Sequence, residues 1–373
     1  AIYLDLEQDF TRRILLTGAI RFEDYSDFGS TFNYKFSGRF KLAEGLNFRG
    51  SISTGFRAPS QQQKFYAKTN TLFVSQGGAL VPVQSGTFTN DSRLAGLLGI
   101  PRLRQETSRN YSVGFTAKPF TSFELTVDAY QIDISRRIIL TNNFTGAAGS
   151  QIRQILDAEG AQTANFFTNA IDTRARGFEA VAAYNKSFRG NHSLRTTLAL
   201  NVNDNQVIRD PVTKRPIIYA SPLLQAGGQL GNYFNREDES RIERANPRDK
   251  VTLMFNYRHR KFSSMLRFVR FGEVLYFDPS TAPVANAFNA SRLETLDQTF
   301  SPKTTTDISF SYEIVKTVTA TIGANNLFDV YPDVQNHSAN QSLGRFVYSR
   351  RVQQMGFNGA YYFARLRLAL PTR

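Results

Sequence analysis

The side chains that most often carry catalysis or bind metals are scarce in this chain. Its 373 residues include no Cys and only three His, at positions His192, His259 and His337. Without Cys, thiolate zinc sites, iron–sulfur clusters and cysteine nucleophiles are excluded. We interpret the three histidines as isolated, solvated side chains, and no HExxH motif, Gly-x-Ser-x-Gly elbow or GxxxxGK(S/T) loop occurs. The sequence therefore predicts no catalytic residue, metal site or cofactor, and we expect that the chain is not an enzyme.

Binding chemistry is better represented, by segments that combine aromatic and basic side chains. This combination suits an anionic or planar-ringed ligand, because cations attract anions and also stack on aromatic faces. The candidate ligand-contacting residues are Arg57, Lys64, Phe65, Tyr66, Arg93, Tyr233, Phe234, Arg236 and His337. For any one of those in the segment 58–103, packing within its own loop or contact with lipopolysaccharide phosphates is the simpler alternative.

Two further segments stand out by their local pattern. The run REDESRIER at 236–244 mixes acids and bases, which indicates a solvated face, and it lacks the spacing of a calcium loop. In Gln151–Gly160, by contrast, Ile152, Ile155 and Leu156 stand at helical spacing. The second segment therefore predicts a short helix that caps a loop.

The elements that must position these residues are strands. Phe32, Tyr34 and Phe36 alternate with Asn33 and Lys35, and the same period of two recurs to the C-terminus in about 13 segments, many of 12–15 residues. Ordinary strands average about 5–6 residues, whereas membrane-spanning strands need about 9–11. No run of 18 apolar residues occurs, which argues against a membrane-spanning helix.

The connections between these segments alternate in length. Short links fall near 9–11, 43–45, 119–121, 187–191, 258–261 and 314–317. Long links fall near 58–103, 137–172, 206–245, 277–300 and 331–354, and only the link near 26–29 is short on that side. Outer-membrane barrels have short periplasmic turns and long extracellular loops, whereas a soluble sandwich or solenoid, the alternative, has no reason to alternate. The sequence thus predicts an all-β, antiparallel transmembrane β-barrel.

In such a barrel the apolar residues of each strand face lipid and the polar ones face a wet lumen. The residues expected to point into the lumen are Arg49, Arg57, Arg195, Arg258, Arg267, Asp128 and Asp307. The arginines either guide an anionic ligand or pair with lumen acids, and the sequence leaves both interpretations open. The acids considered for such pairs are Glu124, Asp128, Glu179 and Asp307.

Four segments, spread over most of the chain, resemble the TonB-dependent outer-membrane receptors. They are STGFRAPS at 53–60, DTRARGFEA at 172–180, GANNLFDVYPD at 323–333 and GFNGAYYFARLRLAL at 356–370. The family often ends on an aromatic residue, whereas Leu370 is followed here by Pro-Thr-Arg.

The resemblance implies a 22-stranded barrel in the bacterial outer membrane, with a plug domain in its lumen. Residues 1–373 then form a partial β-barrel domain of about 13 C-terminal strands, and the plug, the coupling box and the first strands precede them. The lumen residues would face the plug. The resemblance also implies energy-dependent uptake of a scarce ligand, through contact between the missing N-terminal region and the inner-membrane energising complex.

The favoured ligand class is an iron–siderophore complex, and a passive porin or uptake of cobalamin, oligosaccharide or peptide are the alternatives. The net charge of +14, from 45 Lys and Arg against 31 Asp and Glu, biases the ligand toward an anionic small molecule. The basic residues are spread along many strands without a recognised module, so we expect no nucleic-acid partner. Outer-membrane lipids and lipopolysaccharide are the remaining expected partners.

Overall fold

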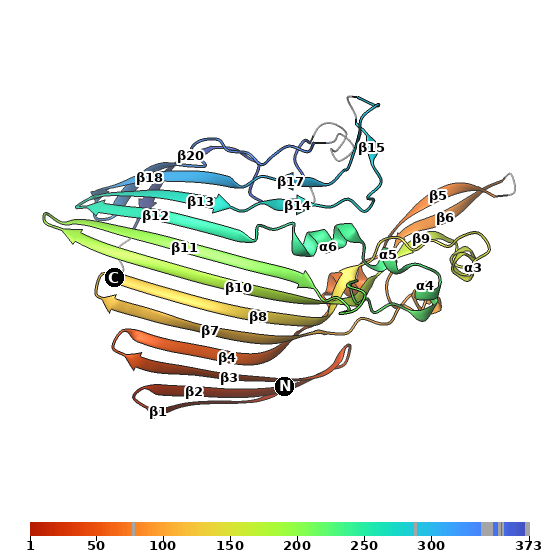
Figure 1. Ribbon diagram of the computed structural model, residues 1–373, viewed down its shortest axis with the longest axis horizontal. Coiled ribbons are helices and arrows are strands. Elements are labelled where there is room, and N and C mark those ends of the chain that lie inside the picture. The colour runs from red at the N-terminus through yellow and green to blue at the C-terminus, as the bar shows by residue number, and fades with distance from the viewer. Residues whose placement is uncertain (77–78, 287–288, 337–345, 350–351, 353, 370–373) are drawn as a thin grey trace.

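The computed structural model describes residues 1–76, 79–286, 289–336, 346–349, 352 and 354–369. Its main element is a 13-stranded antiparallel sheet in which strands follow one another in chain order (Figure 1), which confirms the predicted all-β fold. The strands of this sheet are β1 (Ile2–Thr11), β2 (Ile14–Tyr25), β3 (Gly29–Ala43), β4 (Leu46–Arg57), β7 (Glu106–Phe120), β8 (Phe123–Leu140), β10 (Phe167–Phe188), β11 (His192–Val207), β12 (Asp249–His259), β13 (Phe262–Phe271), β18 (Lys303–Val315), β19 (Val318–Asn325) and β20 (Tyr361–Leu368).

The period of two gives the sheet an aromatic face and a polar face. Register partners share a face, so Phe48 on β4 lies beside Phe115 on β7, with ring centroids 5.9 Å apart, while Arg49 and Gly114 lie on the opposite face. Residues of the aromatic face remain solvent-exposed, including Leu198 at 47%. Such a face needs an apolar environment, which lipid supplies.

The connections at the two ends of the sheet differ as predicted. The turns at one end cover only 12–13, 44–45, 121–122, 189–191, 260–261 and 316–317. The connections at the other end cover 26–28, 58–105, 141–166, 208–248, 272–302 and 326–360. The third of these is shorter than the predicted 137–172, because β8 and β10 stay paired as far as Leu140 and Phe167, beyond their apolar stretch.

The long connections contain secondary structure of their own. Their helices are α1 (Gln61–Phe65), α2 (Arg93–Leu97), α3 (Gln151–Ala158), α4 (Pro222–Ala226), α5 (Leu230–Tyr233) and α6 (Arg236–Glu243). Their strands are β5 (Lys68–Gln76), β6 (Ala79–Thr87), β9 (Ala161–Asn165), β14 (Val274–Tyr276), β15 (Val284–Ala285), β16 (Leu293–Glu294) and β17 (Gln298–Phe300). The helix α3 confirms the predicted one, and its N-cap is Ser150. No helix within the described ranges is long and apolar enough to cross a membrane.

The buried apolar residues gather in these connections rather than between layers of the main sheet. The larger cluster combines residues from three of them with residues at the adjoining ends of β10 and β11: Leu94, Ala95, Leu98, Ile100, Phe144, Ile152, Leu156, Ala161, Ala164, Phe166, Ala170, Ile171, Val207, Leu224, Tyr233 and Phe234. Strand β9 also pairs in parallel with β6, although the two belong to different connections. The connections 58–105, 141–166 and 208–248 therefore fold as one body, which we call the outer body (right side of Figure 1).

The position of Leu198 on the aromatic face of β11 yields a test of the lipid-facing assignment. Leu198→Arg should destabilise the complete protein in lipid by about 2–4 kcal/mol, because a guanidinium at the bilayer midplane loses its hydration. Ala199→Arg, one residue further and on the polar face, is the matched control and should cost much less. Folding titrations in lipid vesicles measure both, and equal costs would contradict the assignment.

Candidate functional site: the polar face and the outer connections

An ion pair on the polar face spans three strands. Arg49 on β4 donates from Nε to Asp128 Oδ1 on β8 at 2.9 Å, reaching across the intervening strand β7. The residue of β7 between them is Gly114, whose register partners are Arg49 and Asp128. A Cβ added to Gly114 would lie 2.1 Å from Asp128 Oδ1 and 2.5 Å from the Val127 carbonyl oxygen. The glycine therefore provides the space in which the two charges meet.

Nearer the outer end, Arg57 on β4 pairs with Glu106 on β7. Arg57 Nε donates to Glu106 Oε2 at 2.8 Å, and the backbone N–H of Ile138 on β8 donates to Glu106 Oε1 at 2.7 Å. The Glu106 side chain is only 7% exposed. Glu106 was not among the predicted lumen acids, because its place beside Arg57 follows from a strand pairing that spans a long connection.

A similar arrangement joins the last strands. Arg267 on β13 donates from Nε to Asp307 Oδ2 on β18 at 2.7 Å, and the N–H of Asn326, just after β19, donates to Asp307 Oδ1 at 2.8 Å. Asp307 is 5% exposed, and these two hydrogen bonds satisfy its carboxylate within the wall that the sheet forms. Of the two interpretations of the polar-face arginines, ion pairing thus holds for Arg49, Arg57 and Arg267.

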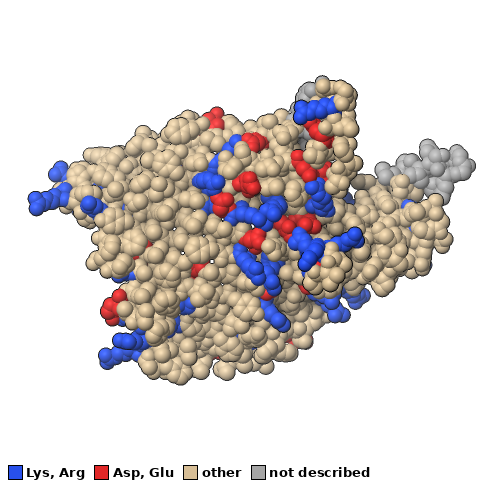
Figure 2. Space-filling model, in the orientation of Figure 1, with Lys and Arg blue, Asp and Glu red and all other residues tan. Residues whose placement is uncertain are grey.

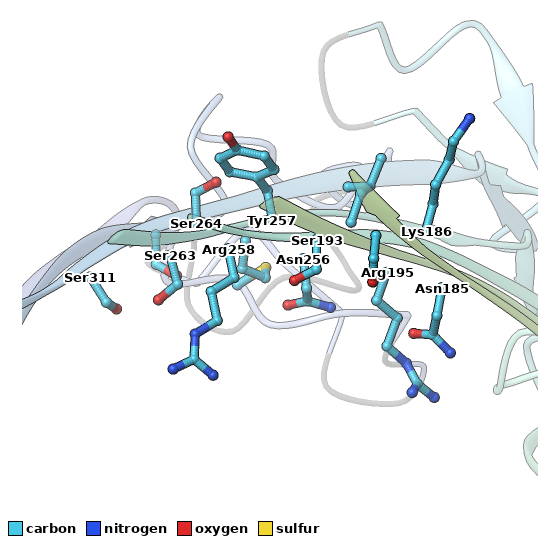
Figure 3. A pocket seen from close by; sticks show the side chains of 14 residues that line it. Asn185, Lys186, Ser193, Arg195, Asn256, Tyr257, Arg258, Ser263, Ser264 and Ser311 are labelled. Atoms are coloured by element: carbon cyan, nitrogen blue, oxygen red, sulfur yellow. The ribbon is translucent and has the colours of Figure 1, made fainter. Parts of the chain in front are cut away.

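Arg195 and Arg258 differ from these three. Both are exposed on the polar face at the short-turn end, and neither has a carboxylate partner in the described part of the chain. They line a recess of about 330 Å³ together with Asn256 on β12 and serines from β10, β11, β13 and β18. Figure 3 shows the two guanidinium groups on the same side of the sheet as Asn256, whereas Tyr257 points to the opposite side. The recess therefore offers two free cations and neutral polar groups.

The aromatic and basic residues after β4 form an exposed segment. Lys64 lies in α1, where its Nζ is 2.6 Å from Asp27 Oδ2 and 5.2 Å from the ring centroid of Phe65. The hydrogen bond from Lys64 lowers the pKa of Asp27 below its ordinary value of 3.8. Phe65 is 62% exposed and Tyr66 46% exposed. Both rings are thus accessible beside the Lys64 ammonium.

Two other predicted ligand residues form ion pairs within the long connections. Arg236 makes a two-armed ion pair with Asp297, at 2.6 Å for its Nη1, and stacks over the Phe277 ring at 4.6 Å. Arg93 is largely exposed and lies 3.1 Å from Glu159, the residue after α3. Arg236 therefore ties two connections together, whereas most of Arg93 stays accessible.

Some expectations need correction. Tyr233 and Phe234 are 1% and 5% exposed in the outer body, because their rings pack with its apolar residues, so we remove both from the candidate ligand surface. The run at 236–244 is not a solvated face: it forms α6, in which Glu237 is buried. Its Glu239 and Glu243 both pair with Arg209.

Two of the three histidines lie side by side in the fold. His192 and His259 are register partners whose rings stack at 3.7 Å between centroids, so the interpretation that both are isolated was wrong. His337 lies outside the described residues. Among the residues that are described, no group of three or more His, Asp or Glu side chains could hold a metal ion.

The helices of the connections have local signals in the sequence that the analysis of strand periodicity does not detect. Ser60 and Gln63 form a capping box at α1, and Asn235 and Asp238 form one at α6. Ser221 followed by Pro222 marks the start of α4. The parallel pairing of β6 with β9 has no local signal, since it joins residues about 80 positions apart.

Comparisons with known proteins show which family has this architecture. A protein-family model, described as TonB-dependent receptor-like β-barrel, matches residues 1–327. A search of curated protein sequences found no match. Solved structures share the fold at low sequence identity, and the chain spans less than half the length of those described next.

One is the siderophore receptor PirA from Acinetobacter baumannii, with a TM-score of 0.61 and 15% identity over 98% of this chain and 45% of that one. Another is a variant of the ferric enterobactin receptor PfeA from Pseudomonas aeruginosa, with a TM-score of 0.62 and 14% identity over 98% and 44%. The copper transporter OprC aligns with a TM-score of 0.57 and 12% identity over 98% and 47%.

The three-strand ion pair predicts that Gly114 tolerates no side chain. Gly114→Ala should destabilise the complete protein by about 1–3 kcal/mol, because the methyl group displaces Asp128 from Arg49 and crowds the backbone. Gly50, a neighbour on the aromatic face, has only an ordinary contact at 3.5 Å, so Gly50→Ala should be neutral or slightly stabilising. Urea titrations in lipid compare the two, and equal stabilities would contradict this role.

The Arg236–Asp297 pair predicts a pH-dependent connection. The hydrogen bond from Arg236 lowers the pKa of Asp297 below its ordinary value of 3.8, so its stabilisation is full above that pH and is lost as the pH falls through the lowered pKa. The Asp278 N–H, which donates to Asp297 Oδ1 at 2.9 Å, should lose hydrogen-exchange protection below about pH 4.

The matched variants for this pH test are Asp297→Asn and Asp91→Asn. The first should weaken protection of the Asp278 amide at pH 6 and remove the acid step. The second changes an exposed pair of another connection, Asp91 with Arg102, and should leave the step unchanged. An intact acid step in Asp297→Asn would show that another group holds the connection.

Proposed function

Because this chain belongs to the TonB-dependent receptor β-barrel family, we propose that it forms part of the wall of a receptor that takes up a scarce ligand with energy supplied from the inner membrane. It is an outer-membrane β-barrel protein. The family and the similar solved proteins are transport receptors rather than enzymes, which supports the expectation that the wall performs no covalent chemistry.

The observation that carries the proposal is the polar recess with Arg195 and Arg258. Two cations without a carboxylate partner in the described wall are suited to a partner inside the lumen. A domain that fills the lumen would remove water from these two guanidinium groups. Because a desolvated charge requires a partner, that domain would present acidic or polar groups here. We infer a plug domain as that partner, and through it the contact with the inner-membrane energising complex.

The directions of the first and last strands of the sheet support a barrel with more than 13 strands. With 13 strands alternating in direction, β1 and β20 both run from the long connections toward the short turns. They would be parallel neighbours if they closed the sheet directly. An odd number of additional strands restores antiparallel pairing throughout, and the nine strands expected for a 22-stranded barrel satisfy this condition.

For the ligand, we favour an anionic iron–siderophore complex. Lys64, Phe65 and Tyr66 combine a cation with two accessible rings on the loop side of the wall, which suits an anionic complex with planar rings. PirA and PfeA, which share the fold, are siderophore receptors. We retain Arg93 as an additional contact because most of its side chain is accessible.

The similarity to OprC makes copper the second candidate. Copper prefers soft ligands such as thiolate, thioether and imidazole. The chain offers no Cys, three Met and three His, so this wall supplies few of them. The ferric complex therefore has the better chemical fit, and copper is included in the test.

The test uses the complete protein in an iron-limited host without its own siderophore receptors. Cells receive ferric catecholate, ferric hydroxamate or Cu(II), and uptake is measured with and without the proton gradient. We expect gradient-dependent uptake of one ferric complex. Phe65→Ala with Tyr66→Ala should weaken binding of that complex roughly tenfold, by removing ring stacking and part of the cation's environment.

The matched control is Val212→Ala, an exposed apolar residue of another long connection. It should leave binding unchanged. Unselective passage of small solutes without a gradient would instead indicate a porin. Gradient-dependent uptake of copper, cobalamin or an oligosaccharide alone would overturn the choice of ligand but not the transporter.

A further inference from the structure

Asn358 and Gly359 form the one Asn-Gly step of the sequence, because every other asparagine is followed by a residue that has a side chain. The two residues lie near the end of the last long connection, 326–360, just before β20 begins at Tyr361. The backbone nitrogen that follows an asparagine can attack the carbon of the side-chain amide. Glycine hinders this attack least, because it has no Cβ and the widest backbone freedom. The sequence therefore favours cyclisation at this step over every other asparagine.

Both reacting groups are free in the fold. Asn358 is exposed, and its side chain makes no hydrogen bond with the residues that the structure describes. The N–H of Gly359 likewise donates to no acceptor in the described chain. Asn143, in another connection, is also exposed, but the N–H of the next residue, Phe144, donates to the Ala164 carbonyl oxygen at 2.7 Å. A free amide nitrogen after an exposed asparagine thus distinguishes Asn358 from Asn143.

The packing around Gly359 requires a glycine. Its φ is +71°, which side chains rarely tolerate, and an added Cβ would lie 2.1 Å from Tyr331 Oη and 2.4 Å from Asp329 Oδ1. Any other residue at this position would be strained and would collide with both side chains. The fold therefore keeps the unhindered nitrogen next to Asn358 for a structural reason.

The same place joins the two ends of the last connection. The N–H of Ala360 donates to Asp329 Oδ1 at 2.7 Å, which ties the residue after Gly359 to the segment that follows β19. The pairing of β19 with β20 begins next to this bond, at Asn325 and Tyr361. A change in the backbone at residue 358 would therefore act directly on the anchor of the connection.

We propose that Asn358 is a site of spontaneous deamidation, which releases the end of the last connection from Asp329. The Gly359 nitrogen gives its proton to a solvent base and bonds to Asn358 Cγ, and the amide nitrogen takes up a proton and leaves as ammonia. The five-membered succinimide that results is opened by water at either carbonyl, which gives aspartate or isoaspartate. Water is the one co-reactant. The inference goes beyond uptake and holds for any transported ligand.

Both products carry a new carboxylate at residue 358. It would lie at the loop-side end of the wall, where Figure 2 shows acidic and basic side chains gathered beside the outer connections. The Asp329 carboxylate contacts the neighbouring residue, so the two negative charges would repel each other. Isoaspartate also adds a methylene group to the backbone, which would displace the Ala360 N–H from Asp329. We therefore expect the modified connection to lose this hydrogen bond.

The experiment incubates the complete protein in nanodiscs at mildly acidic and at mildly alkaline pH. Peptide mass spectrometry measures conversion of each asparagine, and an isoaspartyl methyltransferase labels the isoaspartate formed. Asn358 should convert progressively, and faster at alkaline pH because the attacking nitrogen must lose its proton. Asn143 in the same sample should stay intact. Hydrogen exchange should show that protection of the Ala360 amide falls in proportion to the converted fraction.

The matched variant is Asn358→Gln, which keeps an exposed amide but would need a six-membered ring for the same attack. It should show neither conversion nor loss of Ala360 protection. An unmodified Asn358 after incubation would overturn the proposal, and so would equal conversion of Asn143, which would indicate general unfolding. Unchanged protection of Ala360 in the converted protein would overturn the release of the connection.

Discussion

Every backbone N–H and C=O group within a bilayer needs a partner from the protein, because the hydrocarbon offers none. In this chain that requirement is met by continuous pairing between sequential strands, as in the unbroken register of β10 with β11 from Phe188–His192 to Thr173–Val207. Once pairing is continuous, each strand separates the lipid on one face from the water of the lumen on the other. The alternation of apolar and polar side chains follows from that separation, and so do the differences between the two faces.

On the polar face, each charged residue restricts which residues the neighbouring strands can carry. An arginine there cannot change strand or depth, so its partner must come from a fixed position on a neighbouring strand. Arg267 meets Asp307 directly across one strand interface, whereas Arg49 reaches Asp128 only because Gly114 leaves the space above β7 empty. The pairing of charges thus depends on register, and register depends on the turns and the apolar face.

This hierarchy explains which features could be predicted from the sequence. The strands and the alternating connections are encoded locally, with a period of two and with turn residues, so both were predicted closely. The pairing of Arg57 with Glu106 spans a long connection, and its partner was missed for that reason. Tyr233 and Phe234 were misjudged because an aromatic residue in a loop has the same local signal whether it contacts a ligand or a core. Only the packing of three distant connections decides that they are buried.

The arginines without carboxylate partners are therefore the informative ones. Arg195 and Arg258 on the polar face lie opposite Asn256 and Ser193 in the register, and a single acidic residue at either position would have paired them, as Asp307 pairs Arg267. Unpaired cations destabilise a wall by mutual repulsion unless something outside it supplies negative charge. In a closed barrel the polar face borders the lumen, so the negative charge for these two arginines has to come from the lumen side of the sheet. This requirement is the physical reason for the plug domain proposed as their partner.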